Sequence, residues 1–459
     1  MIYTNKNLKF FLIFSWVLCL LSIGSAVENN FLVEFKYNKE NVLLNINLLR
    51  FFSPTIIFPI LLFFFLKLKK QYNHFICTYF IYGFWQILIF IILKDNLDII
   101  QNYQIILNLF TTLLIFQLIN HFNEDLKKNL LFIFMIFIFL ILLFFSYKLF
   151  LEFYNNNDLY LYKSNILAPN NSILEQAVPR ITGLSRMAII IFSFIFLYQI
   201  TTYNKIYKTL CKLFLFFLVI AIYAFNTRTG IVGLIIFFLY YFIFINHSIT
   251  KKILNFFFII ILPILIFEMI INIKINLAIK KNNLEINYLS NNNRSSDHSN
   301  NISKHNRVLT YQGSSGRIEI WRNSLAIIQE KNIILGIGPQ ADRKLLTDYI
   351  KKNSDKIEIL ENNSSNAIIY SYLCGGLVSF FAFMFIYILV FKEIFLNLFL
   401  KKLSYKNNLY VNFSLFNLIF LSLRTFFENG YAHFGIDFCL LCLCYFIIKD
   451  FDNSKKTYN

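Results

Sequence analysis

The sequence predicts an all-α, polytopic membrane protein with about 12 transmembrane helices and a large external loop that contains short amphipathic helices. Two features of the composition predict this class. Of the 459 residues, 57% are hydrophobic and only 15% are charged, which is typical of a membrane protein rather than of a large soluble core. The third observation is the placing of the lysines, which lie between long apolar runs.

About twelve apolar runs have the length of a membrane span, since about 20 helical residues cross the hydrocarbon core. The fourth run is the most polar, because Gln and Asn residues dilute its start. The first run follows two lysines, as a signal peptide would, but it is longer than a signal core and other spans follow, so we expect an uncleaved helix. The runs are 8–26, 51–68, 75–93, 102–120, 129–151, 186–203, 210–226, 229–246, 253–273, 367–391, 408–426 and 431–448.

The lysines predict the orientation of these spans. Every second connection is rich in lysine, from Lys6 and Lys9 before the first span to Lys449 after the last, and the connections between carry few or balanced charges. Because cytoplasmic loops carry the excess of Lys and Arg, we expect both termini in the cytoplasm. The net charge of +18 has the same explanation, so no nucleic-acid partner is expected.

Two external segments, at about 152–185 and 274–366, are longer than the other connections. They divide the chain into a first part with nine spans (1–273), the large loop (274–366), and a last part with three spans and a tail (367–459). No soluble domain of ordinary size is left over, so we expect function in these loops and in the span ends that they meet.

No metal or cofactor is predicted. The sequence has seven cysteines, and three of them, Cys439, Cys442 and Cys444, lie inside an apolar run without histidine or carboxylate at metal-ligand spacing. A buried apolar role is therefore expected for them.

The late part of the large loop predicts two amphipathic helices, at 317–331 and 341–352. In the first, apolar residues recur every three or four positions, which places them on one face and predicts that this face binds the helix to its support. These residues are Ile318, Trp321, Leu325 and Ile328. The helices either cover the transmembrane bundle or form the roof of a cavity into which Arg317 is presented.

Arginines at the outer membrane boundary predict an anion site. Arg228 lies between two spans that leave almost no loop, and a cation held there needs a counter-charge. Arg180 and Arg186 stand where the first external loop re-enters the membrane, where snorkelling to lipid headgroups is the alternative role. Because the guanidinium fork matches phosphate oxygens in paired hydrogen bonds, several such arginines suit a pyrophosphate.

Five motifs occur in order along the chain: "RITGL", "TRTGIVGL", "SGRIEIWRNSLAIIQEKNIILGIGP", "SSNAIIYSYLCGGLVSF" and "RTFFENG". Together they resemble the bacterial O-antigen ligase and O-antigen polymerase superfamily of integral membrane proteins. The resemblance covers most of the chain and is most specific between about 180 and 380.

This resemblance implies a metal-independent glycosyltransferase at the periplasmic face of the bacterial inner membrane. Its donor would be a glycan on a polyprenyl pyrophosphate, and its acceptor another lipid-linked repeat unit (polymerase) or lipid A core (ligase). Membrane lipid and, for a polymerase, a chain-length regulator are the other implied partners. By position, Arg180, Arg228 and Arg317 would neutralise the pyrophosphate leaving group. Arg186, Trp321 and Asn366 are the further candidates for binding substrate.

The chain departs from the ligase pattern at the expected general base. Ligases have His-Asn just before the span at 367, and here Ser365 and Asn366 occupy those positions. Serine cannot act as a base at neutral pH, so the departure favours a polymerase over a ligase, and an inactive homologue is a further alternative. The candidate replacement bases are Glu428 and His433, although a packing role is the alternative for His433.

A transporter or flippase of lipid-linked sugars is the alternative from another functional class. Such proteins commonly have internal repeats and helices broken by Gly or Pro near the bilayer midplane. The sequence shows no repeat between its halves, and glycine (13) and proline (6) are scarce, which favours the enzyme.

Overall fold

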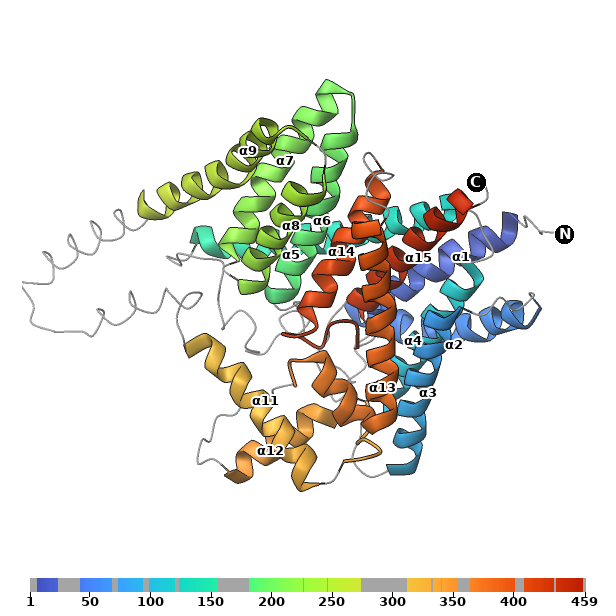
Figure 1. Ribbon diagram of the computed structural model, residues 1–459. Helices are drawn as coiled ribbons and strands as arrows, with labels where there is room; N and C mark the ends of the chain where they lie inside the picture. The colour runs from blue at the N-terminus through green and yellow to red at the C-terminus, as the bar shows by residue number, and fades with distance from the viewer. Residues whose placement is uncertain are drawn as a thin grey trace, which may run out of the picture. The chain divides into compact units, whose positions relative to one another are not determined.

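A computed structural model describes most of the chain as helices (Figure 1). The described residues contain no β-strand, so the predicted all-α fold is confirmed. They are 6–23, 42–67, 73–93, 99–119, 124–155, 181–225, 227–245, 247–273, 312–331, 333–339, 341–353, 364–400, 408–432 and 435–456.

Each predicted span coincides with a helix, because local apolar composition is enough to specify one. The helices are α1 (Lys6–Ile23), α2 (Val42–Lys67), α3 (His74–Leu93), α4 (Ile99–Ile119), α5 (Glu124–Asn155), α6 (Ile181–Thr201), α7 (Lys205–Ala224), α8 (Arg228–Phe244), α9 (Ile249–Phe256), α13 (Ala367–Phe395), α14 (Leu409–Arg424) and α15 (Ile436–Lys456). After α9 the helix continues through a π-turn to residue 273. The last helix begins at Ile436 rather than near 431, because Gly430–Ala432 forms a separate 3-10 turn.

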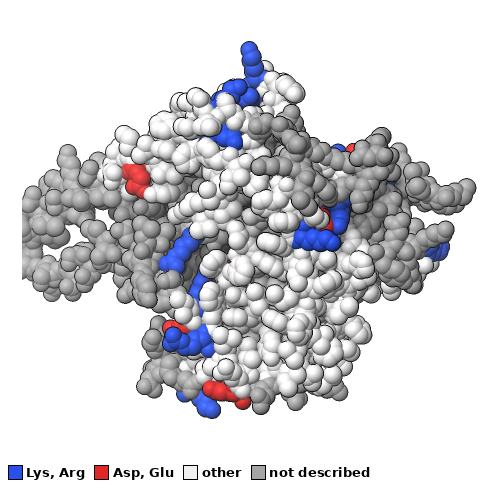
Figure 2. Space-filling model, in the orientation of Figure 1, with Lys and Arg blue, Asp and Glu red and all other residues white. Residues whose placement is uncertain are grey.

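Among the described residues, six helices are long and apolar enough to cross a membrane, and shorter apolar helices accompany them. The outward-facing side chains of these helices are also apolar: Phe84 on α3 is 56% exposed and Phe381 on α13 is 64% exposed. On the face drawn in Figure 2 the described surface is mostly uncharged. Such a surface is suited to lipid rather than water, and the chain is a multi-pass membrane protein.

The chain forms two compact units. The first consists of residues 1–137 and 316–459, and in it α13 packs beside α3, and α14 beside α15 (Figure 1). The second consists of residues 138–315, in which α6, α7 and α8 pack together. Its core is a cluster of aromatic rings, Phe192, Phe196, Phe237 and Phe238.

The two predicted amphipathic helices are present as α11 (Gln312–Glu330) and α12 (Ala341–Asn353). They pack on the first turns of α13 through a small core made by Ile327, Ile333, Leu346 and Leu373. The face of α11 that faces this core carries Ile320, Ile327 and Ile328.

The predicted packing face of α11 was therefore wrong for Ile318 and Leu325, which are 50% and 52% exposed. The helix has two apolar stripes, and the buried one is interrupted by Ser324. The hydroxyl of Ser324 donates a hydrogen bond to the carbonyl of Ile320 (2.8 Å). Spacing alone favoured the stripe with more apolar residues, whereas the tertiary contacts decide which stripe is covered.

Helix α13 is interrupted in its third turn. Gly376 has φ 57° and ψ −154°, which is not helical, and the connection between α11 and α12 fits against the interruption. Three backbone hydrogen bonds of 2.9 Å join the two segments: Ile337 N–H to Leu373 O, Gly338 N–H to Cys374 O, and Leu377 N–H to Ile334 O. The carbonyls and N–H group that the broken helix leaves without helical partners are thus satisfied.

Candidate functional site

Four charged side chains form a chain of contacts in the first unit, where α11 meets the ends of α14 and α15. Arg424, the last residue of α14, forms an ion pair with Asp437 in the first turn of α15. Its Nη2 is also 3.5 Å from Oε2 of Glu428, and the Oε1 of Glu428 is 3.4 Å from Nη2 of Arg317 on α11. Two positive and two negative groups balance one another.

Burial decreases along this chain of contacts. The side chains of Arg424 and Asp437 are 8% and 3% exposed, whereas those of Glu428 and Arg317 are 25% and 34% exposed. A buried pair of this kind must keep both partners, because either one alone would be an uncompensated charge. The outer pair is accessible, so Arg317 can exchange Glu428 for another anion at little cost.

The N-terminus of α13 is fixed by an amide cluster. Asn366 is the N-cap of α13: its Oδ1 accepts from the N–H groups of Ile368 (2.9 Å) and Ile369 (3.1 Å), and its Nδ2 donates to Phe426 O (3.1 Å). The Oδ1 of Asn429 accepts from the N–H of Asn366 (3.1 Å), which ties the N-cap to the segment after α14. The amide of Asn366 thus has a positioning role in the fold, and its substrate-binding role stays a prediction.

Ser365, which the resemblance aligns with the histidine of ligases, has a left-handed backbone with φ 47°. A non-glycine residue is rarely found there, and such conformations gather at functional sites. The indole N–H of Trp321 donates to Ser365 O (3.4 Å), and the preceding N–H, of Ser364, donates to the buried Asp342 on α12 (2.9 Å). Ser365 is therefore held in place from α11 and α12 together.

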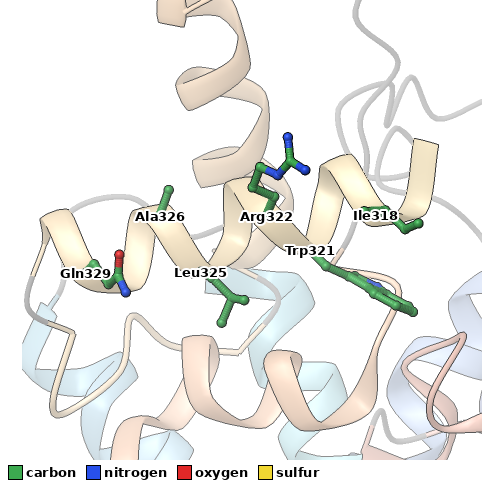
Figure 3. A pocket seen from close by; sticks show the side chains of 6 residues that line it. All are labelled: Ile318, Trp321, Arg322, Leu325, Ala326 and Gln329. Carbon is green, nitrogen blue, oxygen red and sulfur yellow. The ribbon is translucent and has the colours of Figure 1, made fainter. Parts of the chain in front are cut away.

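An open groove runs along the outer stripe of α11, with a volume of about 420 Å³ (Figure 3). In Figure 3, Trp321 and Leu325 point to one side of the helix and Arg322 points to the other. The residues that line it are Ile318, Trp321, Arg322, Leu325, Ala326 and Gln329. The groove is apolar with an arginine at its edge, which suits a ligand with both apolar and anionic parts.

The second unit has a polar contact at the helix ends that carry the other predicted arginines. Thr227 is the N-cap of α8: its Oγ1 accepts from the N–H of Gly230 (3.2 Å) and donates to Ser185 Oγ on α6 (2.6 Å). Arg186 directly follows Ser185, and Arg228 directly follows Thr227. The contact therefore brings the start of α8, with Arg228, to the turn of α6 that carries Arg186.

Glycine is required at 230 for that close approach. A Cβ there would lie 2.3 Å from Ser185 Oγ, well inside van der Waals contact. The "TRTG" motif thus combines an N-cap, an arginine and a small residue for packing, and the helix N-terminus adds to the positive potential around Arg228.

The structure thus brings together Arg317, Trp321, Asn366 and Glu428 in the first unit, and it brings the helix turns of Arg186 and Arg228 together in the second. Arg180 and His433 lie outside the described residues. No group of three or more His, Cys, Asp or Glu side chains that could hold a metal occurs in the described part of the chain.

Arg424 and Asp437 were not among the candidate site residues predicted from the sequence. An arginine at the end of an apolar run, four residues before a glutamate, was the available signal, because residues four apart share a helical face. The burial of Cys439, Cys442 and Cys444 was predicted correctly.

A family model described as O-antigen ligase matches residues 213–384. The matched segment contains Arg228 on α8, Arg317 and Trp321 on α11, and the N-terminal half of α13 with Asn366. No curated protein matches the chain. The chain is thus similar to O-antigen ligases over more than a third of its length, and the predicted resemblance to the ligase and polymerase superfamily is confirmed.

Proposed function

We propose that this protein, which is similar to O-antigen ligases over a segment that contains Arg228 and Arg317, transfers a glycan from a polyprenyl-pyrophosphate carrier to a sugar hydroxyl. The transfer takes place at the periplasmic face of the bacterial inner membrane, with both termini of the chain in the cytoplasm. The observation that carries this proposal is Arg317, a partly exposed arginine 3.4 Å from Glu428 and one turn from Trp321.

The arginines would act on the leaving group. As the glycosidic bond to phosphate breaks, negative charge develops on the pyrophosphate, and fixed guanidinium groups stabilise it most where water is partly excluded. Arg317 supplies one such group in the first unit, and Arg180, Arg186 and Arg228 stay candidates by their place in the sequence. The groove of α11 would accept the part of the donor beside the pyrophosphate.

Glu428 is the proposed general base. One of its oxygens contacts Arg317 and the other contacts Arg424, which the buried Asp437 holds in place. When Arg317 turns to the pyrophosphate, Oε1 of Glu428 is released. It can then take the proton of the acceptor hydroxyl as that oxygen attacks the anomeric carbon, and the pyrophosphate leaves on its carrier. His433 is the alternative base.

The acceptor is proposed to be another lipid-linked repeat unit, which makes the reaction a polymerisation of O-antigen or a related surface polysaccharide. Ser365 favours a polymerase over a ligase, since it replaces the histidine that the resemblance assigns to ligases. Transfer to lipid A core is the alternative. A chain-length regulator is a proposed partner of the polymerase.

Deletion of the gene in the native host tests this function, with surface polysaccharide resolved on a gel. A lipid A core carrying one repeat unit identifies a polymerase, whereas loss of all repeats, with long polymer accumulating on the carrier, identifies a ligase. Wild type and Lys331→Ala, a charge change at the exposed end of α11, should restore the pattern, and Arg317→Ala and Arg228→Ala should not. An unchanged pattern after deletion would refute the proposal.

The interruption of α13 at Gly376 is a feature that secondary transporters also have, so transport is the second candidate. Purified protein in detergent separates the two, because it has no compartments between which to transport. Lengthening of a lipid-linked repeat unit in that preparation supports the enzyme, and flipping of the lipid in vesicles without any lengthening supports the transporter.

A further inference from the structure

The connection between α11 and α12, residues 333–339, lies beside a membrane span at mid-height. Trp85 on α3 marks the level, because its indole N–H donates to Gly375 O (2.8 Å) and contacts Leu335 O (3.3 Å). Trp85 is eleven residues after the first residue of α3 and eight before the last. At 1.5 Å per residue, about 12 Å of apolar helix thus continues beyond this level, toward the end of α3 that the lysine pattern predicts to be external.

That continuation of α3 is itself exposed and apolar. Ile91 and Ile92, in its last turn, are 56% and 70% exposed, and the whole span His74–Ile92 is apolar enough to cross a membrane. A helix of 20 residues is about as long as the hydrocarbon core is thick, so its last turn marks the outer edge of that core. The connection lies below that edge.

The side chains of the connection fit the same surroundings. Ile334 and Leu335 are both 59% exposed, and beside them Leu377 and Val378 on α13 are 39% and 38% exposed. The carbonyls of Ile334 and Leu335 are meanwhile paired with the N–H of Leu377 and the indole of Trp85. A non-helical segment in hydrocarbon needs hydrogen-bond partners for its backbone groups and apolar side chains on its outside. A segment in water needs neither.

Two glycines make this arrangement possible. Gly336 has φ 97° and Gly376 has φ 57°, a region that other residues rarely adopt. A Cβ on Gly376 would lie 2.0 Å from Ile334 O, and one on Gly336 would lie 2.5 Å from Gly376 N. The backbones of the connection and of α13 therefore touch directly.

We propose that residues 333–338 form a re-entrant segment, with Ile334 and Leu335 in contact with the acyl chains of the outer leaflet. The occupant of this surface is membrane lipid, because the exposed side chains are continuous with the lipid-facing surfaces of α3 and α13. The segment anchors α11 and α12 to the bilayer, which keeps Arg317 and the groove at headgroup level. The inference rests on the membrane fold and not on the proposed glycosyl transfer.

Site-directed spin labelling of the full chain in lipid nanodiscs tests this. Single cysteines replace Ile334 or Leu335 in a background where the partly exposed Cys77 and Cys211 are serine. Ile91→Cys on α3 reports a lipid-facing position, and Lys331→Cys, at the exposed end of α11, reports water. Collision with oxygen, which concentrates in hydrocarbon, is compared with collision with a water-soluble nickel chelate.

Spin labels at 334 and 335 should collide more with oxygen than with the nickel chelate, as is expected of the label at 91. Labels that favour the nickel chelate, as the label at 331 should, would overturn the proposal. Gly376→Ala supplies a second measurement: it pushes the connection away from α13 and should move the label at 335 toward the nickel chelate. No change there would show that contact with α13 does not hold the segment in the membrane. Since neither measurement uses substrate, a failure here leaves the proposed transfer reaction intact.

Discussion

Replacement of Glu428 by glutamine separates its proposed catalytic role from its role in the fold. The change keeps the shape of the side chain and removes its charge and its basicity. The change weakens two contacts of Glu428, one of 3.4 Å with Arg317 and one of 3.5 Å with Arg424. The side chains of Glu428 and Arg317 are partly exposed. Such ion pairs contribute about 0.2–1 kcal/mol each, so unfolding should become easier by less than about 2 kcal/mol.

The expected loss of activity is much larger than that structural cost. A positioned general base contributes about 10²–10⁴-fold to a rate, and glutamine cannot accept the proton. Glu428→Gln should therefore lower kcat by at least about 10²-fold while substrate still binds, since Arg317 is then free of its anionic partner. The assay is lengthening of a lipid-linked repeat unit by purified protein, with thermal unfolding measured on the same preparation.

Asp437→Asn provides the contrasting control. It leaves Arg424, 8% exposed, without its closest counter-charge, and breaking a buried pair in this way costs about 3–5 kcal/mol. This variant should lose stability first, seen as a lower unfolding temperature, and lose activity only as a consequence.

Two results would refute the reasoning about Glu428. Activity of Glu428→Gln within about threefold of wild type would show that the carboxylate is not the base and would move that role to His433. A fall in stability as large as that of Asp437→Asn would show that Glu428 is part of the buried pair rather than an accessible member of the site.

The remaining predictions concern the arginines and two positions that hold the fold. Arg317→Ala should lower kcat by about 10²–10³-fold, and Arg317→Lys should restore part of it, since lysine retains the charge but not the fork; equal kinetics for the two would contradict bidentate binding. Arg228→Ala should lose transfer activity while the unfolding temperature stays close to that of wild type; a parallel drop in both would indicate a structural role. Gly230→Ala should destabilise the protein by about 1–3 kcal/mol, because the new Cβ meets Ser185 Oγ, and an unchanged unfolding temperature would mean that α6 and α8 relax apart. Asn366→Ala should cost about 0.5–2 kcal/mol as a lost N-cap, whereas Asn366→Asp, which can still cap, should cost less; equal losses would assign the effect to the Nδ2 contact with Phe426.

The sequence by itself determined the features that depend on local composition. Each predicted span is a helix, because an apolar run of about 20 residues has no other way to satisfy its backbone in lipid. The two amphipathic helices of the large loop were also predictable from periodicity, and the resemblance followed from motifs that stand in order along the chain.

Only the tertiary structure decided which side chains meet. The buried stripe of α11 contains Ser324 and is the less apolar one in the sequence, and Arg424 gains its partner Asp437 from the next helix. The connection at 333–339 reads as an ordinary turn rich in glycine, yet it joins the interruption of α13 at Gly376 through backbone hydrogen bonds. Such contacts depend on backbone approach and on charge pairing between residues far apart in the chain, and neither leaves a periodic signal in the sequence.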